Sequence, residues 1–296
     1  MTYCGRFAPS PTGPLHQGSL VAALASYLDA RQHQGRWLLR IEDLDPLRES
    51  ISARDAILNS LEAHGLHWDG PVHYQSQRHQ AYEQLLHQWQ QQGRIYPCPC
   101  SRKELQAADG YHPRHCRQQP DWQSPAPRAL RFALSDTEGQ WQDRLLGALS
   151  YHLVAEQDDP VLKRKEGYYA YHLGVVCDDI DQGVNQIVRG QDLLESTPIH
   201  LALYQALAQP APGYLHIPLL CNAQGQKLSK QTHAPALDDR QAGNNLWCAL
   251  RSLHQSPPAD LQPAPVTEIL AWAQQHWRAT ALPGPVAAGG SLAVPS

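Results

Sequence analysis

Two polar segments contain the residue types best suited to phosphate chemistry. The first, RFAPSPTGPLHQGS, spans residues 6–19, and the second, KLSKQ, spans residues 227–231. His16 precedes a helical pattern, and the N–H groups and dipole at a helix start favour a bound phosphate. Lys227 and Lys230 offer ammonium groups to the same kind of ligand. Each segment alone could equally be an ordinary surface loop. Phosphate chemistry is indicated because both segments occur in one chain.

A second candidate site is a group of cysteines in the middle of the chain. Cys98, Cys100 and Cys116 lie close together in the sequence. Thiolates and imidazoles suit Zn²⁺, which takes four such ligands in a tetrahedron. The Cys-x-Cys gap is shorter than is usual in structural zinc sites, so three reduced cysteines without a metal are the alternative. The candidates for a fourth ligand are Tyr111, His112 and His115.

The elements around the first segment form a βαβ unit. Residues 2–7 alternate as a half-buried strand does, and apolar residues recur at helical spacing from Gly18 to about Gln34. The run WLLRI at residues 37–41 is short and apolar, as in a buried strand. The loop after the first strand of such a unit is where these folds bind ligands.

Further elements follow along the rest of the chain. Apolar spacing predicts helices in residues 55–64, between Arg78 and Gly93, in residues 243–254 and in residues 266–277. Alternation between Arg128 and Val154 predicts two strands, in the runs LRFAL and ALSYHLV. From Ala281 the composition turns to Ala, Gly and Pro, which predicts a loose tail.

Composition limits the compartment and the partners. The chain has 296 residues, no apolar run long enough to span a bilayer and no secretory signal at its start. Its seven cysteines have no regular spacing, which argues against a disulfide framework and for a reducing compartment. We therefore expect a cytoplasmic protein without a membrane partner. The net charge of −4 means that any RNA contact requires a local basic face.

Considered together, the two segments resemble the signatures of one enzyme family. HQGS at residues 16–19 is similar to the HIGH motif of class I aminoacyl-tRNA synthetases, and KLSKQ is similar to their KMSKS loop. The first segment, followed by RIEDLD at residues 40–45, narrows the resemblance to the glutamyl-tRNA synthetase branch. Ser19 can still cap the helix as an N-terminal serine does. The departures from the motifs are Gln17, Ser19 and Gln231.

The resemblance implies an α/β fold with three regions. A Rossmann-type nucleotide-binding catalytic domain would comprise residues 1–94 and 172–235. Residues 95–171 would form an inserted zinc-binding subdomain that contacts the acceptor, and residues 236–296 a short helical C-terminal region with a loose tail. The chain offers no room for the anticodon-binding domain of a full glutamyl enzyme.

The resemblance also bears on the metal. A short relative of the glutamyl enzymes binds zinc through Cys-x-Cys, a tyrosine and a final cysteine. It implies one structural Zn²⁺ per chain, held by Cys98, Cys100, Tyr111 and Cys116. Here Tyr111 stands five residues before Cys116 instead of four, and His112 occupies the four-back position. His112 and His115 therefore stay open as alternatives.

For the nucleotide, the resemblance assigns catalytic roles to three residues. His16 and the adjacent helix start would hold the phosphates, and Lys227 and Lys230 would meet the charge that grows on pyrophosphate. Mg²⁺ is expected with ATP, because it usually bridges substrate phosphates. The implied ATP-binding residues are His16, Gly18, Ser19 and Lys230.

For the amino acid, the planar guanidinium groups of Arg6 and Arg189 suit a carboxylate. Glu42 would take the α-ammonium group and Tyr171 would shape the pocket. Two buried arginines facing a neutral amide would leave costly charge uncompensated, so the set favours glutamate over glutamine. The implied glutamate-binding residues are Arg6, Phe7, Ala8, Pro9, Ser10, Glu42, Tyr171 and Arg189.

Together these features predict an ATP-dependent ligase that acts as a monomer. It would convert L-glutamate to glutamyl-adenylate without tRNA and transfer glutamate to the queuosine base in the anticodon of tRNA(Asp), as a short branch of the family does. One alternative is a compact glutamyl-tRNA synthetase that charges the 3′ end of tRNA(Glu). The other is a non-catalytic tRNA-binding relative, which would have no need of the full set of motif residues.

Overall fold

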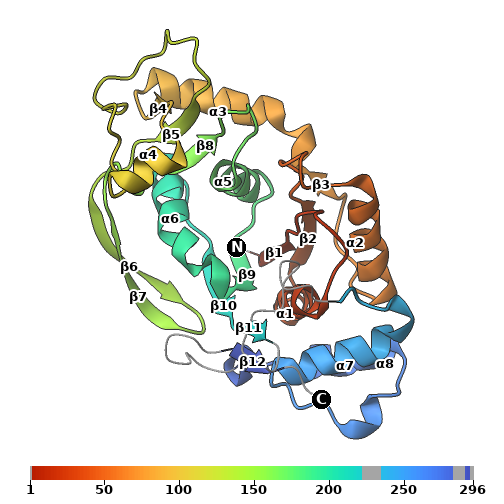
Figure 1. The fold of residues 1–296 in the computed structure, drawn as a ribbon. Coiled ribbons are helices and arrows are strands. Elements are labelled where there is room, and N and C mark those ends of the chain that lie inside the picture. Colours follow the sequence, from red (N-terminus) through yellow and green to blue (C-terminus); the bar gives the residue numbers. More distant parts are fainter. Residues whose placement is uncertain (1, 222–234, 283–290, 294–296) are drawn as a thin grey trace.

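The computed structural model describes residues 2–221, 235–282 and 291–293. Its first sheet has the order β1-β2-β3 with all strands parallel, and one helix connects the first two strands (Figure 1). This arrangement confirms the predicted βαβ unit. The elements are β1 (Cys4–Phe7), α1 (Gln17–Gln32), β2 (Arg36–Ile41) and β3 (His73–Tyr74).

A second sheet continues beside the first and has the order β7-β6-β10-β9. Cys4 N donates to Asn185 Oδ1 over 2.9 Å and Asn185 N donates to Cys4 O over 3.0 Å, so β9 flanks β1. Strands β2 and β3 lie on one side of β1, and β9 and β10 lie on the other. Such a reversal of strand order is a topological switch point, where α/β folds bind ligands. The strands are β6 (Thr137–Asp143), β7 (Gly147–Leu153), β9 (Gln186–Gly190) and β10 (Gly213–Ile217).

Helix α1 is apolar on most of its surface and is therefore buried on most sides. Leu20, Leu24 and Leu28 are fully buried in one cluster with the strands of the first sheet. The same cluster includes side chains of the two helices predicted in the C-terminal region, so these helices complete the burial of α1. They are α7 (Ala242–Ser252) and α8 (Val266–His276).

The middle of the chain forms an antiparallel sheet of its own, ordered β4-β5-β8. The hairpin β6–β7 lies in the same stretch of sequence but pairs with β10. Part of the predicted insertion at residues 95–171, the hairpin β6–β7, therefore extends the sheet that contains β9 and β10. The sheet and its neighbouring helices are β4 (Ile95–Cys98), β5 (Ala129–Phe132), β8 (Val161–Lys163), α3 (His79–Gln91), α4 (Arg102–Ala107), α5 (Tyr171–Asp181) and α6 (Thr197–Ala206).

The remaining elements include one that the sequence did not predict. Helix α2 (Ile51–Ala63) begins earlier than the predicted helix at residues 55–64. In the predicted loose tail, β12 (Ser291–Ala293) pairs in parallel with β11 (Leu219–Cys221). Backbone hydrogen bonds create this strand, and an Ala- and Gly-rich composition gives no sign of them. No helix in the described ranges is long and apolar enough to cross a membrane.

Candidate active site

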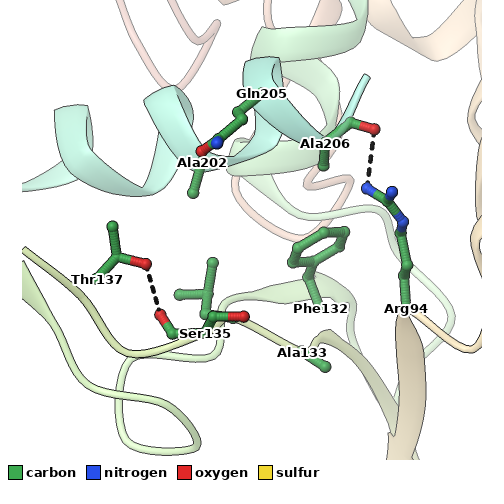
Figure 2. Close-up of a pocket in the computed structure, with 9 residues that line it drawn as sticks. Arg94, Phe132, Ala133, Ser135, Thr137, Ala202, Gln205 and Ala206 are labelled. Atoms are coloured by element: carbon green, nitrogen blue, oxygen red, sulfur yellow. Dashed lines mark hydrogen bonds between the residues drawn. The ribbon is translucent and has the colours of Figure 1, made fainter. Parts of the chain in front are cut away.

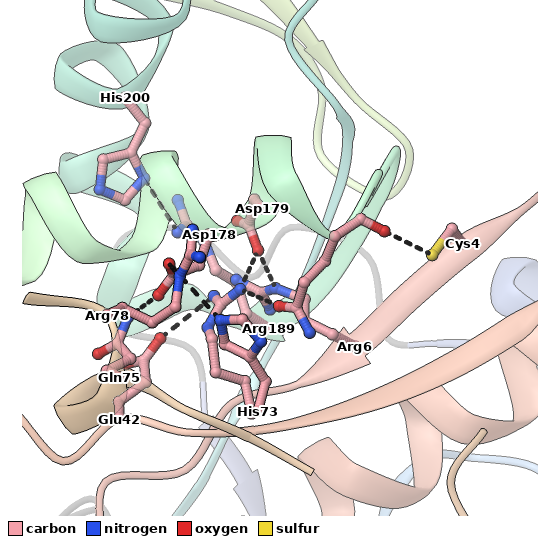
Figure 3. Close-up of polar contacts among 12 residues, drawn as sticks. Cys4, Arg6, Glu42, His73, Gln75, Arg78, Asp178, Asp179, Arg189 and His200 are labelled. Carbon is pink, nitrogen blue, oxygen red and sulfur yellow. Dashed lines mark hydrogen bonds and ion pairs between the residues drawn. The ribbon is translucent and has the colours of Figure 1, made fainter. Parts of the chain in front are cut away.

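The carboxyl ends of the parallel strands bring together three residues predicted to bind the amino acid, Arg6, Glu42 and Arg189 (Figure 3). Arg6 lies on β1, Glu42 follows β2, and Arg189 lies on β9; they are 5%, 8% and 4% exposed. Tyr171 begins α5, and its hydroxyl lies 3.5 Å from Arg189 Nη1. Residues far apart in the sequence thus form one buried polar cluster.

Two residues that the sequence did not single out hold this cluster together. Asp179 Oδ1 accepts hydrogen bonds from Arg6 Nε at 3.2 Å and from Arg40 Nη1 at 2.7 Å. Arg40 Nη2 also donates to Glu42 Oε1 at 3.3 Å. Arg40 and Asp179 are fully buried, and Arg40 Nε and Asp179 Oδ2 have no partner among the described residues. Arg40 begins the RIEDLD motif at residues 40–45, but nothing in the sequence shows which groups pair.

The two carboxylates of the cluster respond differently to their surroundings. Burial opposes the charge on Asp179, yet Arg40 and Arg6 outweigh it, and the pKa of Asp179 is lowered. For Glu42, burial exceeds the attraction of Arg40 and Arg6, so its pKa is raised. Burial also raises the pKa of the Tyr171 phenol to about 12. Asp179 therefore stays ionised and balances the charge of Arg6 and Arg40. An added cation next to Glu42 would stabilise the ionised form of that carboxylate.

Arg189 differs from the other two arginines of the cluster. It forms no ion pair with an aspartate or glutamate among the described residues, and all its described hydrogen bonds go to uncharged groups. The acceptors are His216 Nε2 (3.0 Å from Nε), Thr197 Oγ1 (2.8 Å from Nη2), Leu193 O (3.2 Å from Nη2), His200 Nδ1 (3.4 Å from Nη1) and Tyr171 OH (3.5 Å from Nη1). A buried cation with such surroundings can be stabilised by an added anionic group.

The imidazoles around Arg189 stay neutral. Burial lowers the pKa of His172 to about 4, and the positive charge of Arg189 adds to this effect. Burial and Arg189 also lower the pKa of His200, whose Nε2 lies 3.1 Å from His172 Nδ1. Neither histidine was predicted as a site residue, because a single histidine outside a motif carries no signal of its own.

The loop from Phe7 to Ser10 follows β1 directly and borders the cluster. Glu42 N donates to Pro9 O over 3.0 Å, which fixes the loop beside the end of β2. Thr12 N donates to Ser10 O over 2.8 Å and tightens the turn that follows. The predicted residues Phe7, Ala8, Pro9 and Ser10 therefore lie where backbone groups can approach a small ligand.

A separate cavity of about 190 Å³ lies at the start of α1 and is lined by His16, Gly18 and Ser19. His16 itself is the N-cap: its Nδ1 accepts a hydrogen bond from Ser19 N at 3.3 Å. Ser19 does not take the N-cap position that the sequence suggested. It occupies the third helical position, and its hydroxyl closes a capping box with the backbone of His16. The helix start thus faces the cavity with His16 at its rim.

The predicted catalytic residues Lys227 and Lys230 lie outside the described residues. The described residues on both sides of their segment, however, adjoin the same cavity. Leu219 and Leu220 line it, and Ala236 forms a β-bridge with His16.

Two further residues of this cavity were not predicted. Gly190 and Asp192 contribute to its wall opposite the start of α1. A Cβ atom at Gly190 would collide with the Asp192 carboxylate and crowd Leu219, so only glycine leaves this wall open. The sequence pointed to Arg189 in this part of β9, but not to its neighbour Gly190.

The three cysteines predicted to bind a metal lie together in the structure, with His112 as the fourth member of the cluster. Cys98, Cys100, His112 and Cys116 place one ligand atom each within 4.8 Å of one another, and all four side chains are buried. Cys98 Sγ lies 3.1 Å from His112 Nδ1, and Cys100 Sγ lies 3.5 Å from Cys116 Sγ. Ligands at Zn–S and Zn–N bond lengths would be about 3.5 to 3.8 Å apart in a tetrahedron, so the donor set fits zinc. Tyr111, the implied fourth ligand, is 47% exposed, whereas His112 is 2% exposed. The structure therefore favours His112, one of the alternatives left open.

A second layer of polar contacts supports His112. Tyr96 OH lies 3.2 Å from His112 Nε2 and donates to Asp159 Oδ2 over 2.7 Å. Arg117 Nη1 pairs with the same Asp159 at 3.2 Å. Because Tyr96 donates its hydroxyl hydrogen bond to Asp159, its oxygen can accept a hydrogen bond from His112 Nε2–H, which leaves Nδ1 free to bind a metal.

The described residues contain a larger cavity away from these sites. About 520 Å³ in volume, it lies between α6 and the β4–β5 sheet and is lined by Arg94, Phe132, Thr137 and Gln205 among others (Figure 2). Arg94 Nη1 donates to Ala206 O over 2.9 Å, so this guanidinium already caps the carbonyl end of α6. No predicted site residue lines this cavity.

The fold and these sites together define a class I aminoacyl-tRNA synthetase. Residues 4–245 match the family of tRNA synthetases class I (E and Q), catalytic domain, and the chain belongs to this family. A solved glutamate tRNA ligase from Elizabethkingia meningosepticum superposes with a TM-score of 0.77 at 23% identity, over 100% of this chain and 67% of that one. It confirms the predicted α/β class I fold.

More similar relatives define a narrower group within the family. The chain is 50% identical over 282 residues to a glutamyl-Q tRNA(Asp) synthetase of Pseudomonas fluorescens, covering 95% of this chain and 94% of that protein. It is 45% identical over 286 residues to a protein of the same name from Vibrio cholerae, covering 96% and 93%. The predicted enzyme class and the predicted resemblance to this branch of the glutamyl enzymes are thereby confirmed.

Proposed function

We propose that this protein activates L-glutamate with ATP, without tRNA, and transfers it to the queuosine base in the anticodon of tRNA(Asp). The acceptor follows from the names of relatives that match along nearly the whole chain. The observation that carries the amino-acid part is Arg189, a buried guanidinium without a carboxylate partner among the described residues. We place the enzyme in the cytoplasm as a monomer.

The charges of the pocket suit glutamate. Arg6, Arg40 and Arg189 contribute three guanidinium groups, against the carboxylates of Asp179 and Glu42. A glutamate zwitterion carries one net negative charge and balances this set, whereas glutamine does not. Arg189 and Arg6 would hold the carboxylate, Glu42 the α-ammonium group, and Tyr171 the flank of the aliphatic chain. The loop residues Phe7, Ala8, Pro9 and Ser10 would close the pocket with backbone contacts.

The cavity at the start of α1 suits ATP. His16, Gly18 and Ser19 would hold the phosphates, which Mg²⁺ neutralises when bound. Asp192 would accept hydrogen bonds from ribose hydroxyls, since a carboxylate there would repel phosphate. We assign Lys230, together with Lys227, to the charge that develops on pyrophosphate.

Activation then requires positioning more than covalent help from the protein. The α-carboxylate of glutamate attacks the α-phosphorus of ATP, and pyrophosphate leaves in line. The glutamate cluster ends at the carboxyl edge of β9, and Gly190 of the same strand lines the nucleotide cavity. This adjacency supports direct attack within one crevice. In the second step a hydroxyl of the queuosine base, in place of the terminal ribose hydroxyl, would attack the carbonyl carbon of glutamyl-adenylate, forming an ester as AMP leaves.

We assign one structural Zn²⁺ to Cys98, Cys100, His112 and Cys116. Its ligands come from the end of β4 and from the segment after α4, so the metal would cross-link a part of the insertion that has little regular structure. This set replaces the one implied by resemblance, with His112 in place of Tyr111.

The proposal is tested by following labelled glutamate onto tRNA(Asp) that does or does not contain queuosine. We expect glutamate-dependent ATP–pyrophosphate exchange in the absence of tRNA, and transfer only to the modified tRNA. Transfer should survive removal of the 3′-terminal adenosine, which abolishes ordinary charging. Loss of labelling on that truncated tRNA, or better labelling of unmodified tRNA(Glu), would identify a compact glutamyl-tRNA synthetase instead.

A further inference from the structure

Three adjacent strands place Asp143, His216 and Arg189 in a row. In the parallel register of β9 and β10, Arg189 and His216 are direct neighbours, so both side chains stand on the same face of the sheet. Asp143 ends β6 on the other side of β10. All three side chains are buried, at 1%, 0% and 4% exposure in the order of the row.

The hydrogen bonds of the row determine where the protons lie. Arg189 Nε is always a donor, so His216 Nε2, 3.0 Å away, must be the acceptor. The ring proton of His216 is then on Nδ1, which donates to Asp143 Oδ2 over 2.8 Å. Leu145 N and Leu146 N both donate to Asp143 Oδ1 over 2.9 Å, and these bonds hold the carboxylate still. The imidazole therefore links a fixed anion to the guanidinium in one orientation.

The row also leaves one side of Arg189 available. Nε is bound by His216, and Nη2 by Thr197 Oγ1 at 2.8 Å. Among the described residues, Nη1 has only the longer contacts of 3.4 Å to His200 and 3.5 Å to Tyr171. A carboxylate arriving at Nη1 therefore gains a strong hydrogen bond without displacing one. Asp143 supplies negative charge to the row but does not occupy the guanidinium itself.

We propose that Asp143 and His216 are positioning residues for substrate recognition: they orient Arg189 through a fixed imidazole so that Nη1 meets the glutamate carboxylate. This inference rests on the proposed function, because it assigns Arg189 to that carboxylate. The aromatic surroundings agree with a fixed ring. Tyr214 stacks on His216 with ring centres 5.7 Å apart, and Trp141 meets it edge-on at 5.4 Å.

A matched pair of variants at His216 separates orientation from mere burial. In His216→Gln the longer amide can place an acceptor near the former Nε2 and should keep a KM for glutamate near that of wild type. In His216→Asn the shorter amide still donates to Asp143 but does not reach Arg189. We expect its KM for glutamate to rise about 10- to 100-fold, with the KM for ATP unchanged, because a hydrogen bond to a charged group is lost.

A variant of the anion tests the other end of the row. Asp143→Asn presents an amide that can donate to His216 Nδ1, which would move the ring proton to Nε2. The Nε2–H group of His216 would then face the Nε–H group of Arg189, and two donors cannot form a hydrogen bond. We expect the same selective rise in the KM for glutamate. Asp136→Asn, an exposed site on the same hairpin, serves as the control and should leave both KM values unchanged.

The tautomer can also be read in the wild-type protein by nitrogen-15 NMR, with the His216 signal assigned by its loss in His216→Gln. A proton on Nδ1 supports the proposal, and a proton on Nε2 overturns it. An unchanged KM for glutamate in folded His216→Asn overturns it as well. Absence of glutamate-dependent exchange in the wild type would instead refute the proposed function.

Discussion

Replacing Asp179 with asparagine should destabilise this protein more than almost any other single charge removal. Asp179 is fully buried and accepts hydrogen bonds from Arg6 at 3.2 Å and Arg40 at 2.7 Å. Breaking a buried ion pair by removing one partner costs about 3 to 5 kcal/mol, because the other charge stays buried without compensation. Two guanidinium groups donate hydrogen bonds to this one carboxylate, so we expect the upper end, about 5 kcal/mol.

The effect should depend on pH in a defined direction. The pKa of Asp179 in the folded protein lies below its ordinary value, so its contribution is fully present above the unfolded pKa of about 3.9. The contribution is lost as the pH falls through the lower, folded-state pKa. The difference in unfolding free energy between wild type and Asp179→Asn should therefore be constant from pH 7 to 5 and shrink below about pH 4.

Urea unfolding followed by tryptophan fluorescence measures this difference, and the chain has eight tryptophans to report it. Asp181→Asn is the matched control on the same helix: Asp181 pairs with Arg78 but is 47% exposed. An exposed pair contributes at most about 1 kcal/mol, so the control should unfold close to wild type. If Asp179→Asn is also within about 1 kcal/mol of wild type, the argument that this carboxylate compensates two buried arginines is wrong.

Three further predictions concern the metal and the nucleotide. His112→Ala should purify without its zinc and Tyr111→Phe should retain one zinc per chain, as measured by elemental analysis; the reverse result would restore Tyr111 as the ligand. Tyr96→Phe should weaken zinc binding about 10- to 100-fold in a chelator competition, because His112 loses its outer partner; an unchanged affinity would show that the contact has no such role. Gly190→Ala should raise the KM for ATP and leave protein stability near wild type, since its methyl group enters the cavity wall near Asp192; an unchanged KM would place ATP elsewhere.

Local sequence patterns predicted the elements around the cavity at the start of α1. The apolar spacing after Gly18 predicted α1 to within two residues at its end, and the run WLLRI predicted β2. These elements depend on neighbours along the chain, whose periodicity can be read directly. Arg6 and Glu42, the residues predicted to bind glutamate, lie close together because both of their motifs are at the carboxyl ends of neighbouring parallel strands.

Strands that contain many polar residues, and whose partner strands lie far away in the sequence, could not be predicted from the sequence. Strand β6 alternates in burial, but its inward positions include Thr137 and Gly139, and its last residue, Asp143, is buried and polar. Nothing in such a run distinguishes it from a loop. Similarly, β12 exists through its backbone pairing with β11.

By itself, the sequence determined the family, the site motifs, the first βαβ unit and the later amphipathic helices, since these depend on residue types at short spacing. Only the tertiary structure decided which groups meet. Asp179 lies 173 residues from Arg6 and 139 from Arg40, and nothing local links them. The choice between Tyr111 and His112 was likewise open, because an irregular segment imposes no period on its side chains. There the direction of each side chain is settled by packing, which buries His112 beside Cys98 and leaves Tyr111 exposed.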